Sequence, residues 1–597
     1  MGFIWLTQPV LWHSSRDRGS LNPALTADQA ALIQARWHNW YTADWDYGQT
    51  TLAFFCAAIA AAMVLNLASM WRARRATSPS QRAGVADRLT AAFRYLTSRQ
   101  FRVRATGYYA PPLSAIFGVS IMAIFVLSLM LAPRPYYWAS MAMGDSQPIA
   151  TRSGWISIAI MPFMIAFATK VNLVGMLTGT SHEKLQVFHR WSAVLMYITS
   201  LVHTFPFIVM NIREGQMMVS WETSSYYWTG VAALVPQTYL ITLSWGIFRN
   251  RYYEIFKKLH FIASGIFMAA LFIHVDWTLT SWDYFFATAA IYTTVWLARV
   301  LRTLATTRLG LPAAVTRATP TLLLLRIPAP GRGRLAWAPG QHLFLRVAGL
   351  GAAHALTSHP FTIASVHADG AVQLVLRVNS GLTRAIVRAV DAAAVGAGAA
   401  WATRVVVDGP YGGVRTALAG YDRVYLLAGG SGATFTLPLL TALAASLQGC
   451  AACRHVEFVV AVRDRESYAW MADAVRAAVA LVPAGRIAAR VHVTGADADA
   501  DVNADADADA KLGSKDDKAE IGSDTDTECL WALGRPDLPQ LVHAAAHAGA
   551  ARVAVVSCGP DAFLYDVRNA VADVQRTIVD GFAPCAEMFL HTESYSW

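Results

Sequence analysis

Two stretches of equal length decide the fold: HRWSAVLMYITSLVH at residues 189–203 and HFIASGIFMAALFIH at residues 260–274. Each begins and ends with histidine and is mostly apolar between. In an α-helix, 14 residues advance about 21 Å and return to nearly the same face. Because a bilayer core is about 30 Å thick, each stretch predicts a membrane helix with one histidine near each side of the membrane.

Two such helices side by side would form two stacked bis-imidazole sites, as two hemes need if electrons are to cross a membrane. The candidate ligands are His189, His203, His260 and His274. A single membrane histidine can also be a hydrogen-bonded buried side chain or a proton relay, which keeps a transporter or channel as an alternative.

Composition predicts a membrane half and a soluble half. The chain has 597 residues, 55% of them hydrophobic, and a mean hydropathy of +0.36. No apolar run of membrane length follows residue 302, so the remainder is expected to be soluble. The seven predicted spans are 50–71, 112–132, 153–176, 186–211, 226–247, 255–275 and 283–301.

Basic loops predict the orientation. By the positive-inside rule these loops face the cytoplasm. Seven spans then put an N-terminal segment (1–49), which lacks a signal-peptide pattern, outside, and the soluble half inside. This asymmetry and anionic lipid account for the net charge of +10, so no nucleic-acid partner is expected. The basic residues are Arg72, Arg74, Arg75, Arg82, Arg88, Arg94, Arg99, Arg102 and Arg104 after the first span, then Lys184, Arg190, Arg249, Arg251, Lys257 and Lys258.

The soluble half divides into two domains. Residues 312–415 contain short β-like runs separated by turns, which predict an antiparallel barrel. Residues 421–597 alternate strands and helices, which predicts a parallel α/β sheet. An Ala-Asp repeat and a polar stretch interrupt this domain at 496–527, and we expect this insert to be disordered.

One group of motifs follows the order of a flavin site. Pro339-Gly340-Gln341-His342 precedes a loop that leads into a strand at His359, Pro360, Phe361 and Thr362. In a flavin site such a strand holds the isoalloxazine, and backbone N–H groups at a helix start hold the pyrophosphate. The same order then continues through Arg377, Gly381 and Thr383.

A second group predicts a dinucleotide site. The strand Tyr425–Ala428 leads into a glycine turn and a helix, an arrangement that lets the backbone approach a phosphate. A later strand ends in Cys558, Gly559 and Pro560, where a nicotinamide would be reached. Arg463, Arg465 or Arg535 could read a 2′-phosphate, or be solvated. The residues of the glycine turn are Gly429, Gly430, Ser431, Gly432, Ala433 and Thr434.

From about residue 153 onward, the chain resembles the fungal ferric reductase family, relatives of the NADPH oxidases. The resemblance rests on the histidine pairs, the PGQH and HPFT motifs, the GGSGAT turn, Gly534-Arg535-Pro536, the CGP motif and the final Glu593–Trp597. It implies a seven-span helical bundle with two b-type hemes, followed by an FAD-binding β-barrel and an NADPH-binding α/β domain of ferredoxin-reductase type.

The resemblance also implies a function. Electrons would pass from cytoplasmic NADPH through FAD and two hemes to extracellular Fe³⁺ chelates or Cu²⁺, at the plasma membrane, in support of an iron or copper uptake system. His189 is expected to pair with His260 at the inner heme and His203 with His274 at the outer one. Trp597 resembles the aromatic residue that covers the flavin. An oxidase that makes superoxide would share these motifs and remains the alternative.

Overall fold

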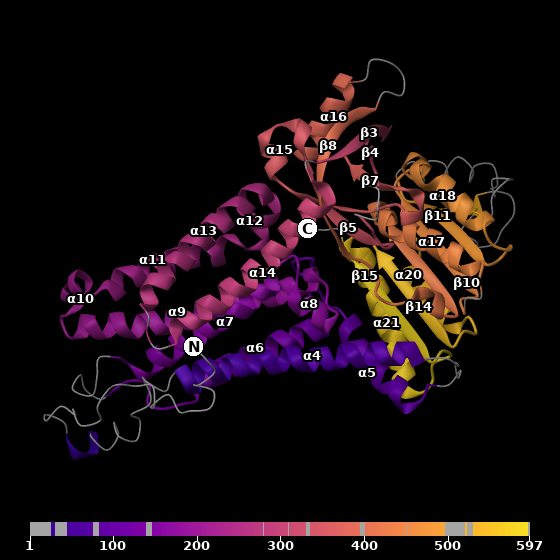
Figure 1. Cartoon of the computed structure of the whole chain (residues 1–597). Coiled ribbons are helices and arrows are strands. Elements are labelled where there is room, and N and C mark those ends of the chain that lie inside the picture. The colour runs from indigo at the N-terminus through magenta and orange to yellow at the C-terminus, as the bar shows by residue number, and fades with distance from the viewer. Residues whose placement is uncertain are drawn as a thin grey trace. The chain divides into compact units, whose positions relative to one another are not determined.

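The computed structural model of this chain describes residues 26–29, 44–75, 83–138, 146–276, 278, 280–308, 310–329, 335–393, 400–449, 452–495, 520–521 and 529–594. The chain forms two compact units (Figure 1). The first comprises Met1–Arg72 and Ala115–Ala298, and the second comprises Ala73–Ser114 and Arg299–Trp597.

The first unit is helical. Its longer helices satisfy their backbone hydrogen bonds internally, as a lipid environment requires. Their side chains are mostly apolar and therefore suit contact with lipid. They are α4 (Thr50–Arg75), which follows the π-helical turn η2 (Asp44–Gln49), α6 (Leu113–Leu131), α7 (Pro148–Ala168), α9 (His182–Arg213), α11 (Ser225–Leu243), α13 (Tyr253–Val275) and α14 (Ser281–Thr307), with short helices α8 (Leu173–Thr178), α10 (Met217–Thr223) and α12 (Gly246–Arg251) between them.

Helix α7 lies at the centre of this unit. It is buried along nearly its whole length, whereas α4, α6 and α13 expose many large apolar side chains. The Phe55 ring of α4 stacks on the Phe163 ring of α7 with centroids 4.7 Å apart. Helix α9 packs along α7, and α11 packs along α13.

Six of the seven predicted spans coincide with helices long and apolar enough to cross a membrane. The fifth predicted span, 226–247, forms helix α11, which is not apolar enough to meet this criterion. Gly430–Leu447 in the second unit also meets these criteria. It packs on a sheet, with Leu440 and Ala444 fully buried, so burial in a protein core explains its composition.

The second unit contains a six-stranded antiparallel sheet within the predicted barrel domain. Its order is β6-β5-β8-β3-β4-β7, and an antiparallel bridge between Ile363 and Leu374 connects its two ends. The strands are β3 (Leu311–Thr319), β4 (Leu322–Pro328), β5 (Gln341–Val347), β6 (His359–Thr362), β7 (Ala371–Arg377) and β8 (Trp401–Gly412), and helix α16 (Leu382–Ala393) follows β7.

The predicted α/β domain is a seven-stranded sheet of order β12-β13-β11-β10-β9-β14-β15, parallel except for β12. One apolar core lies between the sheet and helices α17 and α18, and another involves α20 and α21. The strands are β9 (Arg423–Gly429), β10 (His455–Val462), β11 (Ile487–Val493), β12 (Glu520–Ile521), β13 (Cys529–Leu533), β14 (Arg552–Cys558) and β15 (Glu587–Glu593), and the helices are α17 (Ala433–Leu447), α18 (Ala469–Ala480), α20 (Leu538–His547) and α21 (Asp561–Asp580).

Two features of the second unit differ from expectation. The predicted insert, 496–527, lies outside the described residues except for β12, which pairs with β13 through Glu520 and Ala532. The segment after the first membrane helix folds into α5 (Val85–Ser98) and a small hairpin, β1 (Arg102–Val103) and β2 (Tyr108–Tyr109), and α5 packs on α21 and β15 (Figure 1). The basic charge of this segment predicted only on which side of the membrane it lies, because nothing in the sequence links the segment to a distant helix.

Candidate functional site

The two histidines of α9 are anchored to the backbone of α7. His189 Nδ1 lies 2.9 Å from the carbonyl oxygen of Met164, and His203 Nδ1 lies 2.8 Å from that of Ala150. The two acceptors repeat the 14-residue spacing of the histidines. Because a carbonyl oxygen only accepts, each Nδ1 carries the proton and each Nε2 keeps the lone pair that a metal ion requires.

The histidines of α13 are held less firmly. His274 Nδ1 lies 3.2 Å from the hydroxyl oxygen of Thr229, which itself donates to the Ser225 carbonyl and therefore accepts from the imidazole. His260 Nδ1 is buried and has no hydrogen-bond partner among the described residues.

One histidine of α9 and one of α13 lie ring to ring. The rings of His203 and His274 are 6.1 Å apart between centroids, at 81°. His189 and His260 lie 14 residues before them on the same two helices. Two imidazoles on one iron, each with a metal–nitrogen bond of about 2 Å, would have centroids about 6 Å apart. The outer pair therefore fits an iron atom between its rings.

Two glycines make room for these rings. A Cβ on Gly154 of α7 would lie 2.7 Å from His203 Nδ1, and one on Gly230 of α11 would lie 3.1 Å from His274 Cε1. Neither position was singled out in the sequence, because a glycine in an apolar helix gives no signal of what packs against it. The tautomers of His203 and His274 and the space beside their rings fit one heme, and the tautomer of His189 suits a second.

The proposed flavin motifs meet as neighbouring strands. His359–Thr362 forms β6 and pairs with β5, so that Leu345 lies opposite His359 and His342 opposite Thr362. If the register of the Ile363–Leu374 bridge continues, Arg377 is level with Pro360. The tertiary structure thus brings PGQH, HPFT and Arg377 to one end of the sheet.

Helix α16 begins beside this end. Gly381 has a φ of +68°, which favours glycine, and directly precedes the helix. The Thr383 hydroxyl accepts a hydrogen bond from the Asn379 backbone N–H at 2.8 Å. The start of a helix offers backbone N–H groups that can bind a phosphate. These residues fit the flavin dinucleotide.

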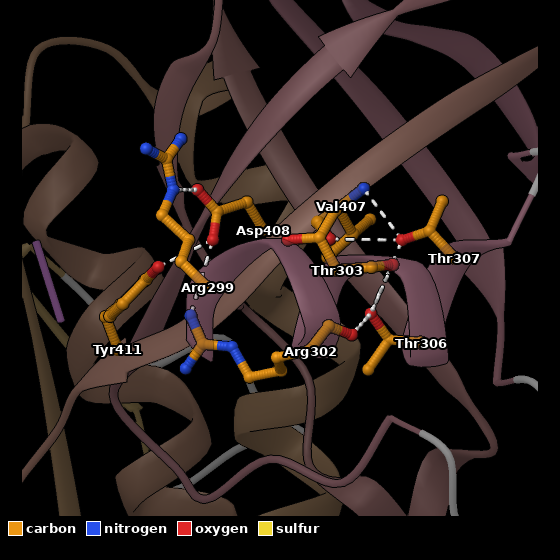
Figure 2. A network of polar contacts seen from close by, with 8 residues as sticks. All are labelled: Arg299, Arg302, Thr303, Thr306, Thr307, Val407, Asp408 and Tyr411. Carbon is orange, nitrogen blue, oxygen red and sulfur yellow. Dashed lines mark hydrogen bonds and ion pairs between the residues drawn. The ribbon is translucent and has the colours of Figure 1, made fainter. Parts of the chain in front are cut away.

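Asp408 of β8 fastens the end of α14 to this domain (Figure 2). Its carboxylate is 2.6 Å from Arg299 Nε and 3.3 Å from Arg302 Nη2, and it accepts from the Tyr411 hydroxyl at 2.6 Å. Burial, together with the Asp408 carboxylate, raises the pKa of Tyr411. The Asp408 side chain is 2% exposed, so this network ties the end of α14, from Arg299 onward, to the sheet. None of its members stood out in the sequence.

The predicted dinucleotide turn lies at the carboxyl edge of the parallel sheet. Strands β9 and β14 are neighbours with Ala428 opposite Cys558, so their following turns lie side by side. Helix α17 starts at Ala433 and α21 at Asp561, and both N-termini therefore lie at this edge. This is where an α/β sheet binds dinucleotides.

The glycines of this turn have a packing role that the sequence did not reveal. A Cβ on Gly432 would lie 2.0 Å from the Cys558 carbonyl oxygen, and one on Gly429 would lie 2.9 Å from Pro560 Cδ. Gly430 has a φ of +56°. The first and last glycines thus let the two turns touch, in addition to any approach to a phosphate.

The candidate 2′-phosphate residues lie near the same edge, on strands farther along the sheet. Arg463 directly follows β10, and Arg535 follows Gly534 at the end of β13; both are exposed. Arg465 lies 5.4 Å from the Trp531 ring centroid, which favours a stacking role for it. Trp597 lies outside the described residues.

The Phe435 ring packs on a residue of its own domain and on the PGQH turn of the other soluble domain, which the sequence did not reveal. Phe435 of α17 stacks on His591 of β15 with centroids 5.8 Å apart. A Cβ on Gly340, in the PGQH turn, would lie 2.8 Å from the Phe435 ring. The flavin-site turn therefore rests on the nucleotide domain.

The comparisons with known proteins agree with this arrangement. Residues 153–271 match ferric reductase like transmembrane component, 313–415 match FAD-binding domain, and 421–572 match ferric reductase NAD binding domain. The chain therefore contains an FAD-binding and an NAD-binding domain behind a membrane part. Three family models thus match in order along the chain, and the two relatives described next are named as ferric or ferric/cupric reductases.

Two curated relatives show the extent of the likeness. "Probable cell surface ferric reductase kap2" of Aspergillus oryzae is 32% identical over 403 residues, which are 64% of this chain and 52% of that protein. "Ferric/cupric reductase transmembrane component 7" of Saccharomyces cerevisiae is 28% identical over 456 residues, 72% of this chain and 70% of that protein. The chain thus spans about half to two thirds of these relatives.

Among solved structures, a flavohemoglobin from Malassezia yamatoensis aligns over 74% of this chain and 98% of that chain, with 13% identity and a TM-score of 0.35. A similarity this low carries no argument about the fold.

Proposed function

We propose that this protein is a transmembrane ferric and cupric reductase that carries electrons from NADPH to Fe³⁺ chelates or Cu²⁺ outside the cell. The observation that carries the proposal is the facing pair His203 and His274, with a second histidine 14 residues earlier on each of the same helices, in a chain that also contains FAD- and NAD-binding domains. When bound, NADPH supplies a hydride, and FAD and two b-type hemes supply the one-electron carriers.

In the membrane, the chain's own residues hold and orient the ligands. His189 and His260 form the inner pair, and His203 and His274 form the outer pair. The α7 carbonyls of Met164 and Ala150 accept from Nδ1 of the α9 imidazoles and so leave each Nε2 lone pair for a metal ion. The apolar helices around them exclude water, which slows side reactions at the reduced carriers.

In the soluble domains, β6 holds the isoalloxazine through His359–Thr362. Arg377 and the start of α16, with Gly381 and Thr383, bind the pyrophosphate. The glycine turn Gly429–Thr434 binds the phosphates of NADPH, Cys558–Pro560 borders the nicotinamide, and Arg535 is a candidate for the 2′-phosphate. Trp597 covers the flavin face until nicotinamide displaces it, since such stacking contributes only about 0.5–1.5 kcal/mol.

The orientation has the N-terminus outside and both nucleotide-binding domains in the cytoplasm of a multi-pass plasma-membrane protein. The packing of α5 on α21 supports this orientation, because it requires the loop after the first span and the nucleotide domain to share one side of the membrane. An iron or copper uptake system is the expected partner.

The oxidase alternative is not favoured, since the curated relatives carry the names of ferric or ferric/cupric reductases. A transporter with histidine proton relays would have no use for two dinucleotide-binding domains.

Inside-out vesicles loaded with a ferric chelate and an Fe²⁺ indicator would test the proposal, because NADPH added outside then reaches only the cytoplasmic domains. We expect NADPH-dependent Fe²⁺ formation inside the vesicles and an absorbance spectrum with two b-type hemes per chain. A cupric salt and oxygen, tried in turn, rank the acceptors. Superoxide formation without ferric reduction would favour the oxidase, and absence of heme would disprove electron transfer through the bundle.

A further inference from the structure

Helix α5 has two unlike faces. Ala91 and Ser98 are buried, and with Asp87, Thr90 and Arg94 they form the side that meets the nucleotide domain. The opposite side of the helix follows from the helical repeat of 3.6 residues. It carries Val85, Leu89, Ala92, Phe93 and Leu96.

The docked face is polar and well connected. Arg94 Nη2 lies 2.8 Å from Glu587 Oε1, and Arg94 Nη1 donates to the Met588 carbonyl at 3.2 Å. Just beyond the helix, Arg99 pairs with Asp573 of α21 at 3.0 Å. These contacts hold α5 against α21 and the edge strand β15.

The opposite face is apolar and exposed. Val85, Leu89 and Phe93, at i, i+4 and i+8, are 78%, 68% and 51% exposed. The adjoining segment and hairpin expose further large side chains: Phe101, Val103 and Tyr108. A helix that docks through its polar face and exposes its apolar face needs a second, apolar partner.

Charge and chain connectivity indicate which partner. Residues 83–113 contain five arginines and one acid, Asp87. Nine residues separate the end of the membrane helix α4 at Arg75 from the start of α5. Fourteen residues separate the end of α5 from the start of the membrane helix α6 at Leu113. Arg94 and Arg99 are engaged by the nucleotide domain, whereas Arg102 and Arg104 beyond the helix are exposed. An apolar stripe followed by exposed arginines fits a helix that lies in an anionic lipid surface.

We propose that α5 is an interfacial helix that inserts Val85, Leu89 and Phe93 into the lipid surface while its other face holds the nucleotide-binding domain. The nucleotide domain then has an attachment to the membrane additional to the chain connection through α14. This attachment acts on α21 and β15, and β15 leads toward the carboxyl terminus of the chain. The proposal requires only that the chain spans a membrane, and is independent of which acceptor is reduced.

Lipid quenching of a fluorescent probe tests the proposal on the full-length protein in lipid nanodiscs. An environment-sensitive fluorophore is attached at Leu89→Cys in a Cys56→Ser, Cys450→Ser background, since the other cysteines, Cys453, Cys529, Cys558 and Cys585, are buried. The matched control is Leu481→Cys, at an exposed apolar residue beyond α18. Unchanged flavin and heme spectra verify that each variant is folded.

We expect lipids that carry a nitroxide near the headgroup to quench the Leu89 probe by about twofold or more, with weaker quenching when anionic lipid is replaced by neutral lipid. The Leu481 probe should not respond. Equal quenching at both positions, or none at Leu89, would overturn the proposal. A Leu89 probe that is shielded from a water-soluble quencher, yet insensitive to lipid nitroxide, would also overturn it and indicate a protein partner such as a second copy of this chain.

Discussion

The two units anchor their functional parts by different chemistry. In the membrane unit, His189 and His203 donate to backbone carbonyls of α7, and no formal charge takes part in these two bonds. In the second unit the corresponding anchors are carboxylates: Asp408 pairs with Arg299 and Arg302, and Glu587 pairs with Arg94 and Arg552.

The difference follows from the surroundings. A charge within a bilayer is costly, whereas a carbonyl of a neighbouring helix is available without bringing a new polar group into the membrane. Outside the membrane, partly exposed arginines stay hydrated while they hold a buried carboxylate. The membrane anchors should therefore respond to steric changes, and the anchors of the second unit to charge and pH. The predictions below test this contrast.

The largest effect is expected for His203→Leu. The outer iron loses a ligand and His274 loses its facing imidazole, so the outer heme should be absent and reduction of external acceptors should fall to background. Heme per chain from the absorbance spectrum and ferric reduction by intact cells measure this. His182→Leu, also on α9 but outside the pairs, should keep both hemes. Full activity with one heme per chain would disprove the two-heme path.

Removing the charge of Asp408 should have the next largest effect. Asp408→Asn leaves Arg299 and Arg302 beside a neutral amide, at a cost of about 3 kcal/mol, the lower end for a buried pair because both arginines are partly exposed. Denaturant unfolding, monitored by flavin release, measures this loss of stability. The control Asp391→Asn breaks an exposed pair with Arg317 and should change stability by about 0.5 kcal/mol or less. Equal effects of the two variants would mean that Asp408 is not an anchor.

A steric change should separate the firmly held histidines from the loosely held ones. In Gly154→Ala the new Cβ meets His203 Nδ1 at 2.7 Å and breaks its bond to the Ala150 carbonyl. We expect heme retention at the outer site to fall about 10- to 100-fold, the range for loss of a ligand's outer partner. In Gly230→Ala the contact is 3.1 Å and His274 can shift, so the loss should be smaller. The reverse order would contradict this account of the anchors.

The charged anchors should be sensitive to acid. Burial alone would raise the pKa of Glu587, but Arg94 and Arg552 outweigh it, and the net pKa is lowered. A lowered folded-state pKa means that the carboxylate stabilises the fold fully above the ordinary glutamate value of about 4.3, and that this contribution is lost as the pH falls through the lowered pKa.

The test is the difference in melting temperature between the unaltered protein and Glu587→Gln. Unfolding is monitored by the rise in flavin fluorescence as the flavin is released. The difference should be large at neutral pH and should shrink as the pH falls below about 4.3. A difference in melting temperature that grows as the pH falls would show that the pKa of Glu587 is not lowered in the folded protein. The His189 and His203 anchors have no carboxylate to protonate, so the heme spectrum should change less over this range.

The smallest effect is expected from the insert, because its Ala-Asp repeat and polar composition predict a segment that makes few packed contacts. Replacing 497–527 by a short Gly/Ser linker should leave NADPH oxidation and flavin content nearly unchanged, since shortening a loop that makes few packed contacts costs little. The deletion removes the two-residue strand β12 from the sheet edge. Loss of flavin or of NADPH oxidation would mean that this edge is essential.

Much of the arrangement could be predicted because it is periodic or local. Histidines 14 residues apart lie on one face of any α-helix, and apolar runs of membrane length are visible without tertiary information. The strands around HPFT and the turn at Gly429–Thr434 were identified for the same reason, since alternation and glycine clusters are local signals.

The rest depends on which segments meet, and local patterns carry no record of that. Asp408, Gly154 and Phe435 look like ordinary strand and helix residues until Arg299, His203 and His591 are placed beside them. Helix α5 shows the same limit. Its arginines predicted one side of the membrane, but its docking on β15 joins residues 494 positions apart.

The sequence by itself determined the membrane helices, the equal histidine spacing and the order of the flavin and dinucleotide motifs, because helical and strand periodicity are properties of neighbouring residues. Only the tertiary structure decided the tautomers of His189 and His203, the contact between the two glycine-rich turns, and the two-faced role of α5. Each of these depends on an atom contributed by a distant segment, and only folding brings such atoms within hydrogen-bond or van der Waals distance.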